Sequence, residues 1–276
     1  MVAGYMRLAV QDEQEAVERI TTFLSGTIGW TIAQDVTNTA TDRDVVFSSA
    51  GEPDVDNSFT RYIRLRGTSN GIKLYTYETF VDVGTNTGEL EDADGILNVE
   101  GDNQGFFITA VADLERVVLQ SQTYNDANRQ AYVGRINSYY TSDQHNYPNI
   151  VKGGEDTTDT WFSPTANNAW MYGAEGSIAE YYGIQPVNSV TLEAGQESDR
   201  NGSMTLGAPI LVRDDADPNL GELVGEPRGV FAGPPEVLAN HIFVAFEGRV
   251  YTVFENDNVP MVVGPVTASG TEIPSF

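Results

Sequence analysis

The chain has 276 residues, which is long enough to bury a substantial core in one large domain or in two modest ones. Forty acidic against fifteen basic residues give a formal net charge of −25, and such a field repels nucleic acid and anionic lipid headgroups. The absence of cysteine excludes disulfides and thiolate zinc sites, and there is no apolar run of the length that a membrane span or a signal peptide needs.

The basic residues are strongly skewed toward arginine, because Lys73 and Lys152 are the only lysines. An excess of short carboxylates with few lysines is typical of proteins from a salt-saturated cytoplasm, where dense salt screens the repulsion between them. We therefore expect a halophilic source rather than an ordinary acidic protein. In that case the negative charge is an adaptation to salt and says little about the partner.

One helix is expected near the N-terminus. Asp12 can cap the free amides of its first turn, and Glu15, three residues later, can reach back as in a capping box. Apolar residues then recur at helical spacing, and they are Ala16, Val17, Ile20, Phe23 and Leu24. Gly26 is the expected stop.

A series of strands follows the helix. They are expected at 30–37, 45–49, 62–66 and 72–79. The polar loop 67–71 joins the last two as a hairpin, in which Ile63 and Leu65 share the face that packs under the helix. A helix over an antiparallel sheet is a small α+β unit, so the expected fold class is α+β, enlarged by a β-rich second module.

The module boundary is expected in the Gly-, Asn- and acid-rich stretch 83–104. The chain therefore divides into an α+β module at 1–100 and a β-rich module at 101–276. Within the second module, hairpins are expected at 106–137 and 241–254, because apolar runs flank short polar or Glu-Gly turns. Further strands are expected at 187–192 and 204–212. The aromatic segment at 161–182 is expected to be satellite core, with the alternative of a surface that binds a glycan or a partner.

Candidate catalytic and cation sites are weak. His145 and His241 lie in different segments, and neither belongs to a His-x-x-x-His pair. Three acidic clusters, at 54–56, 91–94 and 214–217, offer oxygen ligands but lack the twelve-residue calcium-loop pattern. Phosphate-binding glycine motifs are also missing. We therefore expect no catalytic residue, no cofactor and no bound metal, and a protein that is not an enzyme.

Arginine and tyrosine side chains on the first sheet are the candidate interface. The residues are Arg61, Tyr62, Arg64, Arg66, Tyr75 and Tyr77. These residue types dominate protein contact surfaces, and on so acidic a chain an arginine row is expected to meet the carboxylates of a neighbouring copy or another acidic subunit. The alternative is that the arginines only neutralise acids on their own sheet.

Several segments resemble the tail-terminator or tail-completion family of tailed viruses. In the first module these segments are the helix ending in Leu24-x-x-x-x-Gly29-Trp30, then Asp44-Val-Val-Phe-Ser48, Tyr62-Ile-Arg-Leu-Arg66 and Ile72-Lys-Leu-Tyr-Thr-Tyr77. The stretch 115–154 is similar to a hairpin and Tyr-Pro segment of larger virion proteins, and 241–254 is similar to their closing hairpin. Terminators are often shorter, so the part after about Gly101 would be an enlargement.

The resemblance implies a hexameric ring that stacks on the last tail-tube ring and offers its other side to the head-completion proteins. In a closed ring, the same asymmetric patch of every copy is covered by the neighbouring copy, so no contact surface is left free. With the acidic composition, it implies a virion protein of a virus infecting a halophilic archaeon, made in the host cytoplasm, with no membrane partner and no direct nucleic-acid binding. The alternatives are a baseplate, tail-tip or capsid-decoration protein, and a surface-glycan hydrolase that would need two buried carboxylates with displaced pKa values.

Overall fold

The computed structural model describes most of the first 138 residues and a smaller part of the rest. The described residues are 3–38, 42–51, 60–68, 71–77, 80–83, 89–91, 105–123, 128–138, 149–153, 169–171, 180–186, 208–213, 223–232, 243–246, 249–254 and 261–267. The predicted strand at 187–192, the acidic turn 214–217, both histidines and most of the aromatic segment lie outside them. No helix in the described part is long and apolar enough to cross a bilayer.

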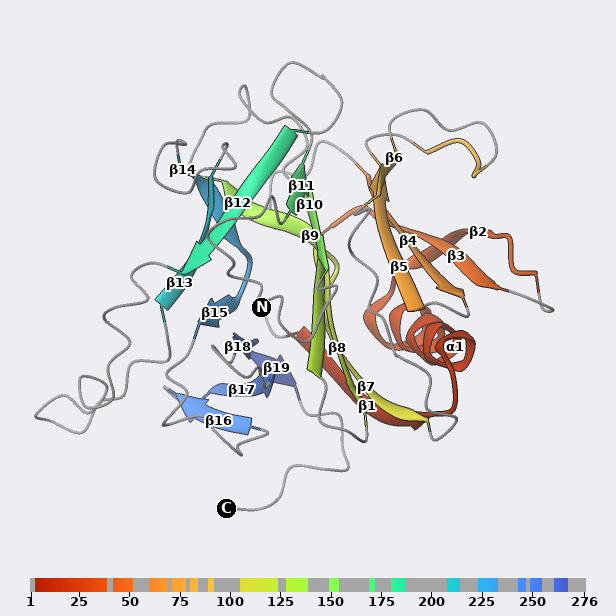
Figure 1. Ribbon diagram of the computed structural model, residues 1–276, viewed down its shortest axis with the longest axis horizontal. Helices are drawn as coiled ribbons and strands as arrows, with labels where there is room; N and C mark the ends of the chain where they lie inside the picture. The colour runs from red at the N-terminus through yellow and green to blue at the C-terminus, as the bar shows by residue number, and fades with distance from the viewer. Residues whose placement is uncertain are drawn as a thin grey trace, which may run out of the picture.

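The first sheet has five antiparallel strands in the order β2-β3-β4-β5-β6 (Figure 1). Their bounds are β2 Thr31–Asp35, β3 Arg43–Ser49, β4 Arg61–Thr68, β5 Gly71–Tyr77 and β6 Glu89–Glu91. The four predicted strands correspond to β2 to β5, and the predicted β4–β5 hairpin is confirmed by pairing from Tyr62–Tyr77 to Thr68–Gly71. Strand β2 lies at one edge, and most of its side chains are exposed.

The second sheet has fourteen strands and takes in both ends of the described chain. Its bounds are β1 Ala3–Val10, β7 Phe106–Ala112, β8 Arg116–Thr123, β9 Asn128–Ser138, β10 Asn149–Gly153, β11 Ala169–Met171, β12 Glu180–Pro186, β13 Ala208–Arg213, β14 Leu223–Pro227, β15 Val230–Ala232, β16 Phe243–Phe246, β17 Arg249–Phe254, β18 Met261–Val263 and β19 Val266–Thr267. The predicted hairpins are confirmed as β7-β8-β9 and β16–β17. Strand β1 was not predicted, and it pairs with β7 across the expected module boundary.

Strand β9 changes neighbours halfway along its length. Residues 128–134 pair with β8, whereas residues 136–138 pair with β14. Because β14 also pairs with β13, the pairings from β9 through β10, β11, β12, β13 and β14 return to β9 and close a ring of strands. The change occurs at Gly134, whose φ of 142° and close approach to Arg116 leave no space for a side chain.

The helix α1, Glu13–Phe23, continues as a π-helical turn, η1, Leu24–Ile28. Asp12 caps it as predicted, because Asp12 Oδ1 accepts from Glu15 N at 2.8 Å, and Glu15 reaches back to Gln11 N at 2.9 Å. The predicted stop at Gly26 is wrong. The helix ends at Gly29, which has the left-handed φ of 97° that a C-terminal cap requires.

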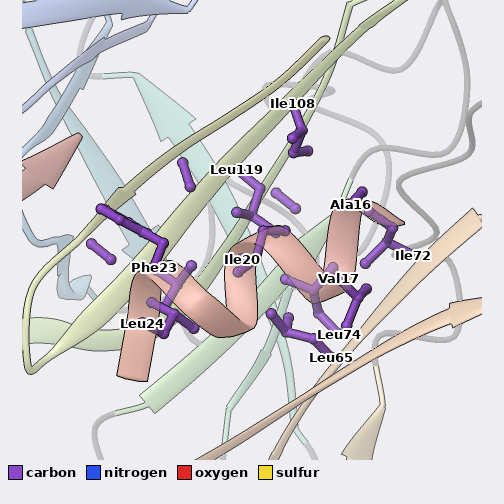
Figure 2. Close-up of a cluster of buried hydrophobic side chains, with 14 of the residues drawn as sticks. Ala16, Val17, Ile20, Phe23, Leu24, Leu65, Ile72, Leu74, Ile108 and Leu119 are labelled. Atoms are coloured by element: carbon purple, nitrogen blue, oxygen red, sulfur yellow. The ribbon is translucent and has the colours of Figure 1, made fainter. Parts of the chain in front are cut away.

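The helix fills the space between the two sheets (Figure 2). Its buried stripe packs on one side against Leu65, Ile72 and Leu74 of the first sheet, and on the other side against Ile108 and Leu119 of the second. Five buried residues of α1 and η1 carry these contacts, and they are the five predicted from helical spacing.

The expected α+β class is wrong. The described chain is mostly β, with one short helix among nineteen strands. The helix is not the covering layer of a helix-on-sheet unit, because it is enclosed between two sheets and its own N-terminal neighbour, β1, belongs to the second of them. The class prediction failed because β1 was not recognised and because the extent of the second sheet was not evident from the sequence.

Candidate functional site

Five of the six residues of the predicted interface, all except Arg61, lie on the face of β4 and β5 that points away from the helix. The register places Tyr62 opposite Tyr77 and Arg64 opposite Tyr75. Tyr75 and Tyr77 are buried in a small cluster with Val46, against which Tyr62 and Phe80 pack. Strand alternation produces this grouping, since even-numbered β4 residues share one face.

Arg64 is held by a neighbouring strand of its own sheet. Its Nε and Nη2 donate to the two carboxylate oxygens of Asp44 on β3, each at 2.7 Å, and Nη1 donates to Tyr77 Oη at 3.3 Å. The guanidinium also lies 4.7 Å from the ring centroid of Tyr75. Burial lowers the pKa of Arg64, but the hydrogen bonds and charges of Asp44 and Tyr77 together outweigh it, so the pKa lies above its ordinary value.

Arg66 is more exposed and pairs mainly with Asp42. Its Nη2 donates to Asp42 Oδ2, and its Nε lies 3.7 Å from Asp44 Oδ2. The hydrogen bond with Asp42 is the main cause of a raised pKa for Arg66. Arg64 and Arg66 therefore neutralise acids of their own sheet, which was the alternative interpretation, and a role for this face as an interface stays a prediction.

Arg61 lies on the opposite face and belongs to a different group of charges. Its Nη2 lies 2.7 Å from Glu115 Oε2, and both side chains are almost inaccessible, at 1% and 0% exposed. Glu115 Oε2 is also 3.6 Å from Nη1 of Arg135, which is partly exposed. The contact joins β4 of the first sheet to the turn between β7 and β8 of the second.

That turn, residues 113–116, collects most of the described polar contacts between the sheets. Trp30 Nε1 donates to the carbonyl of Asp113 at 2.8 Å, and Ser49 Oγ donates to the carbonyl of Leu114 at 2.7 Å. The turn is closed by its own hydrogen bond from Asp113 N to Arg116 O. The sheets are thus fixed to one another by named polar contacts as well as by the apolar core.

Arg116 extends from the turn toward two bends in the second sheet. Its Nε donates to Asp113 Oδ2 at 3.2 Å, and its Nη2 donates to the carbonyl of Gly264 at 3.3 Å. The guanidinium lies against Gly229, where an added Cβ would come within 2.8 Å of both terminal nitrogens. Gly264 N in turn donates to Gly229 O at 3.0 Å, so Arg116 braces the point where β14–β15 and β18–β19 both bend.

The electrostatics of the 113–116 region are dominated by burial. Burial and the neighbouring cations Arg135 and Arg228 lower the pKa of Arg61 to about 10, against the opposing attraction of Glu115 and Asp113. Burial likewise raises the pKa of Tyr132, whose hydroxyl donates to the carbonyl of Arg135 and accepts from Arg228 N. Burial is therefore the largest cause of both shifts.

The sequence interpretation missed the 113–116 region, and it assigned no chemistry to the stretch beginning at Glu115. The available signal was the run Asp113-Leu-Glu-Arg116 between two strongly apolar strands, because charges in such a context need buried partners. Within the described residues, no three His, Cys, Asp or Glu side chains are grouped so as to hold a metal ion. The contacts of this region brace the two sheets against one another.

No known protein family matches the chain. A search among curated proteins also gives no match.

Proposed function

We propose that the protein is a structural component of a virus tail or neck, and specifically a ring-forming tail terminator that joins the tail tube to head-completion proteins. The segments that resemble terminators, at 24–30, 44–48, 62–66 and 72–77, lie in one packed unit of α1, η1 and the first sheet. A rigid unit of this kind can present one surface in the same orientation in every copy.

The observation that carries the proposal is the exposed edge strand β2. It pairs with β3 on one side only among the described strands, and its second residue, Ile32, is 41% exposed. An edge strand offers unpaired amides and carbonyls to another chain, and an exposed β-branched residue adds apolar contact. In this proposal the contact between copies lies at this edge, because the arginines of the first sheet are engaged within their own chain.

A structural role also fits the state of the buried acids. Among the described side chains, the buried carboxylates are Asp44, Asp113 and Glu115, and each lies beside an arginine. A hydrolase would need a carboxylic acid raised in pKa beside a second, ionised one. A baseplate, tail-tip or capsid-decoration protein would use the same scaffold, and only its position in the virion would separate it from a terminator.

The test is the particle mass in molar salt, measured by light scattering or sedimentation. A hexamer has six times the 30.1 kDa mass of the monomer. Ile32→Glu should dissociate the ring, whereas Leu8→Glu, at an equally exposed position on β1, should leave it intact. A monomer at high protein and salt concentration, or hydrolysis of a surface glycan by the purified chain, would refute the proposal.

A further inference from the structure

Strand β1 is covered only in part on the edge that faces away from β7. Strand β19 pairs with this edge in parallel, at Ala3–Val266 and Gly4–Thr267, and its bounds end there. Among the described strands, residues 6–10 of β1 pair with β7 alone. This part of β1 is therefore an edge to which a further strand can add.

The pairing at Ala3 shows which backbone groups this edge presents. Ala3 N donates to Pro265 O at 2.8 Å, so the backbone groups of Ala3 point toward β19. Because the direction of these groups alternates along a strand, those of Arg7 and Ala9 point the same way, whereas those of Leu8 point toward β7. The amides and carbonyls of Arg7 and Ala9 thus have no strand partner in the described part of the chain, and a continuation of β19 would supply one.

The side chains along this edge are also incompletely covered. Leu8, on the face toward the helix, is 41% exposed, and Phe107, beside Ala9 on the other face, is 39% exposed. Arg7 lies 5.2 Å from the ring centroid of Phe107 and donates to Gln122 Oε1 at 2.9 Å. Within the described residues no carboxylate is among the contacts of Arg7. A strand with an acid on the face of Arg7 and an apolar residue on the face of Leu8 would therefore be complementary to this edge.

The chain continues from β19 in the direction that such a strand requires. Residues 268–276, which lie outside the described residues, read Ala-Ser-Gly-Thr-Glu-Ile-Pro-Ser-Phe. Continued in the register of β19, this segment gives the pairs Leu8–Thr271, Ala9–Glu272 and Val10–Ile273.

This register is complementary to the edge in charge, in polarity and in length. It places Glu272 on the face of Arg7 and Ile273 on the face of Leu8. Pro274, which has no amide to donate, follows where β1 ends. We propose that residues 269–273 extend β19 as a strand along residues 6–10 of β1, so that the chain covers this edge with its own C-terminal segment and pairs Glu272 with Arg7.

A disulfide tests the register, because the chain has no cysteine of its own. Leu8→Cys combined with Thr271→Cys should oxidise to a bridge within one chain, which is detected as the loss of both thiols at the monomer mass on a denaturing gel. Leu8→Cys combined with Glu272→Cys is the control, and it should form at least about tenfold less bridge because position 272 lies on the other face. Equal bridging of the two pairs, bridging between two chains, or no bridging of the first pair would overturn the proposal.

Hydrogen exchange tests the cover in the unmodified chain. The amides of Arg7 and Ala9 should be protected in the full chain and should exchange at least about tenfold faster in a chain shortened to residues 1–267. The amide of Leu8 faces β7, so its protection should persist and reports that the shortened chain is folded. Fast exchange of Arg7 and Ala9 in the full chain would overturn the proposal, whether or not the shortened chain folds. The proposed ring contact lies on β2, so a monomer in which both amides are protected would refute the ring alone.

Discussion

The ion pair between Arg61 and Glu115 is expected to contribute more to stability than any exposed pair. Glu115→Gln keeps the shape of the side chain and removes its charge. Arg61 has 1% of its side chain exposed, so solvent cannot readily take the place of its partner's charge. Breaking a buried pair costs about 3–5 kcal/mol because one charge is left uncompensated.

The expected loss for Glu115→Gln lies at the lower end of that range. The amide oxygen of the new side chain still accepts a hydrogen bond from Arg61, and Arg135, 23% exposed, can turn partly toward solvent. We therefore expect a loss of about 3 kcal/mol in the free energy of unfolding, a large share of the 5–15 kcal/mol that is usual for a folded domain.

Urea unfolding measures this loss, and molar potassium chloride keeps the charges of the acidic surface screened during the measurement. Arg66→Gln is the matched control, because it breaks a partly exposed pair on the same strand and should cost less than about 1 kcal/mol. Replacing both partners, Arg61→Met with Glu115→Leu, should recover part of the loss. If Glu115→Gln costs no more than Arg66→Gln, the burial argument is refuted.

Three further predictions concern other parts of the chain. Gly134→Ala should lower the free energy of unfolding by about 3 kcal/mol or more, since its φ is positive and its Cβ would lie 2.5 Å from the carbonyl oxygen of Glu115. Gly26→Ala is the control and should not destabilise the fold, because no atom lies within 4 Å of its Cβ. Thermal unfolding compares the two variants. Asp44→Asn should cost about 3 kcal/mol in urea unfolding by leaving Arg64 half-paired. Hydrogen bonding from Gln11 N, and then that from Arg19, lowers the pKa of Glu15. The contribution of Glu15 to stability is therefore full above pH 4.5 and is lost as the pH falls through the lower pKa of the folded state. Glu15→Gln should flatten the acid limb of a stability–pH profile, and an unchanged limb would contradict this.

Local patterns predicted the helix and many strands because their determinants are close in sequence. The cap at Asp12, the buried stripe of α1 and the β4–β5 hairpin all depend on spacings of a few residues. Strand β1 was missed because its sequence alternates poorly, and its strand status depends on pairing with β7, about a hundred residues away. No local pattern reports such a pairing.

The candidate site was only partly predictable for a related reason. Alternation correctly separated Arg64 from the helix face, but it could not show that Asp44 on β3 would take both of its donors. Arg61 was grouped with the interface residues, whereas it lies on the apolar side with Ile63 and Leu65, and its partner comes from a turn 54 positions further along. Charges are assumed to be solvated unless a distant partner is known, so the buried group escaped notice.

Strand β19 reaches back to the first strand of the chain and pairs with it in parallel, from Ala3–Val266 to Gly4–Thr267. A nascent chain therefore holds β1 without this neighbour until β19 has been synthesised. The β1–β19 pair therefore forms long after β1 itself has left the ribosome. Removal of the segment after residue 260 would leave that end of β1 free to pair with strands of other chains. Misassociation during biosynthesis is the expected consequence.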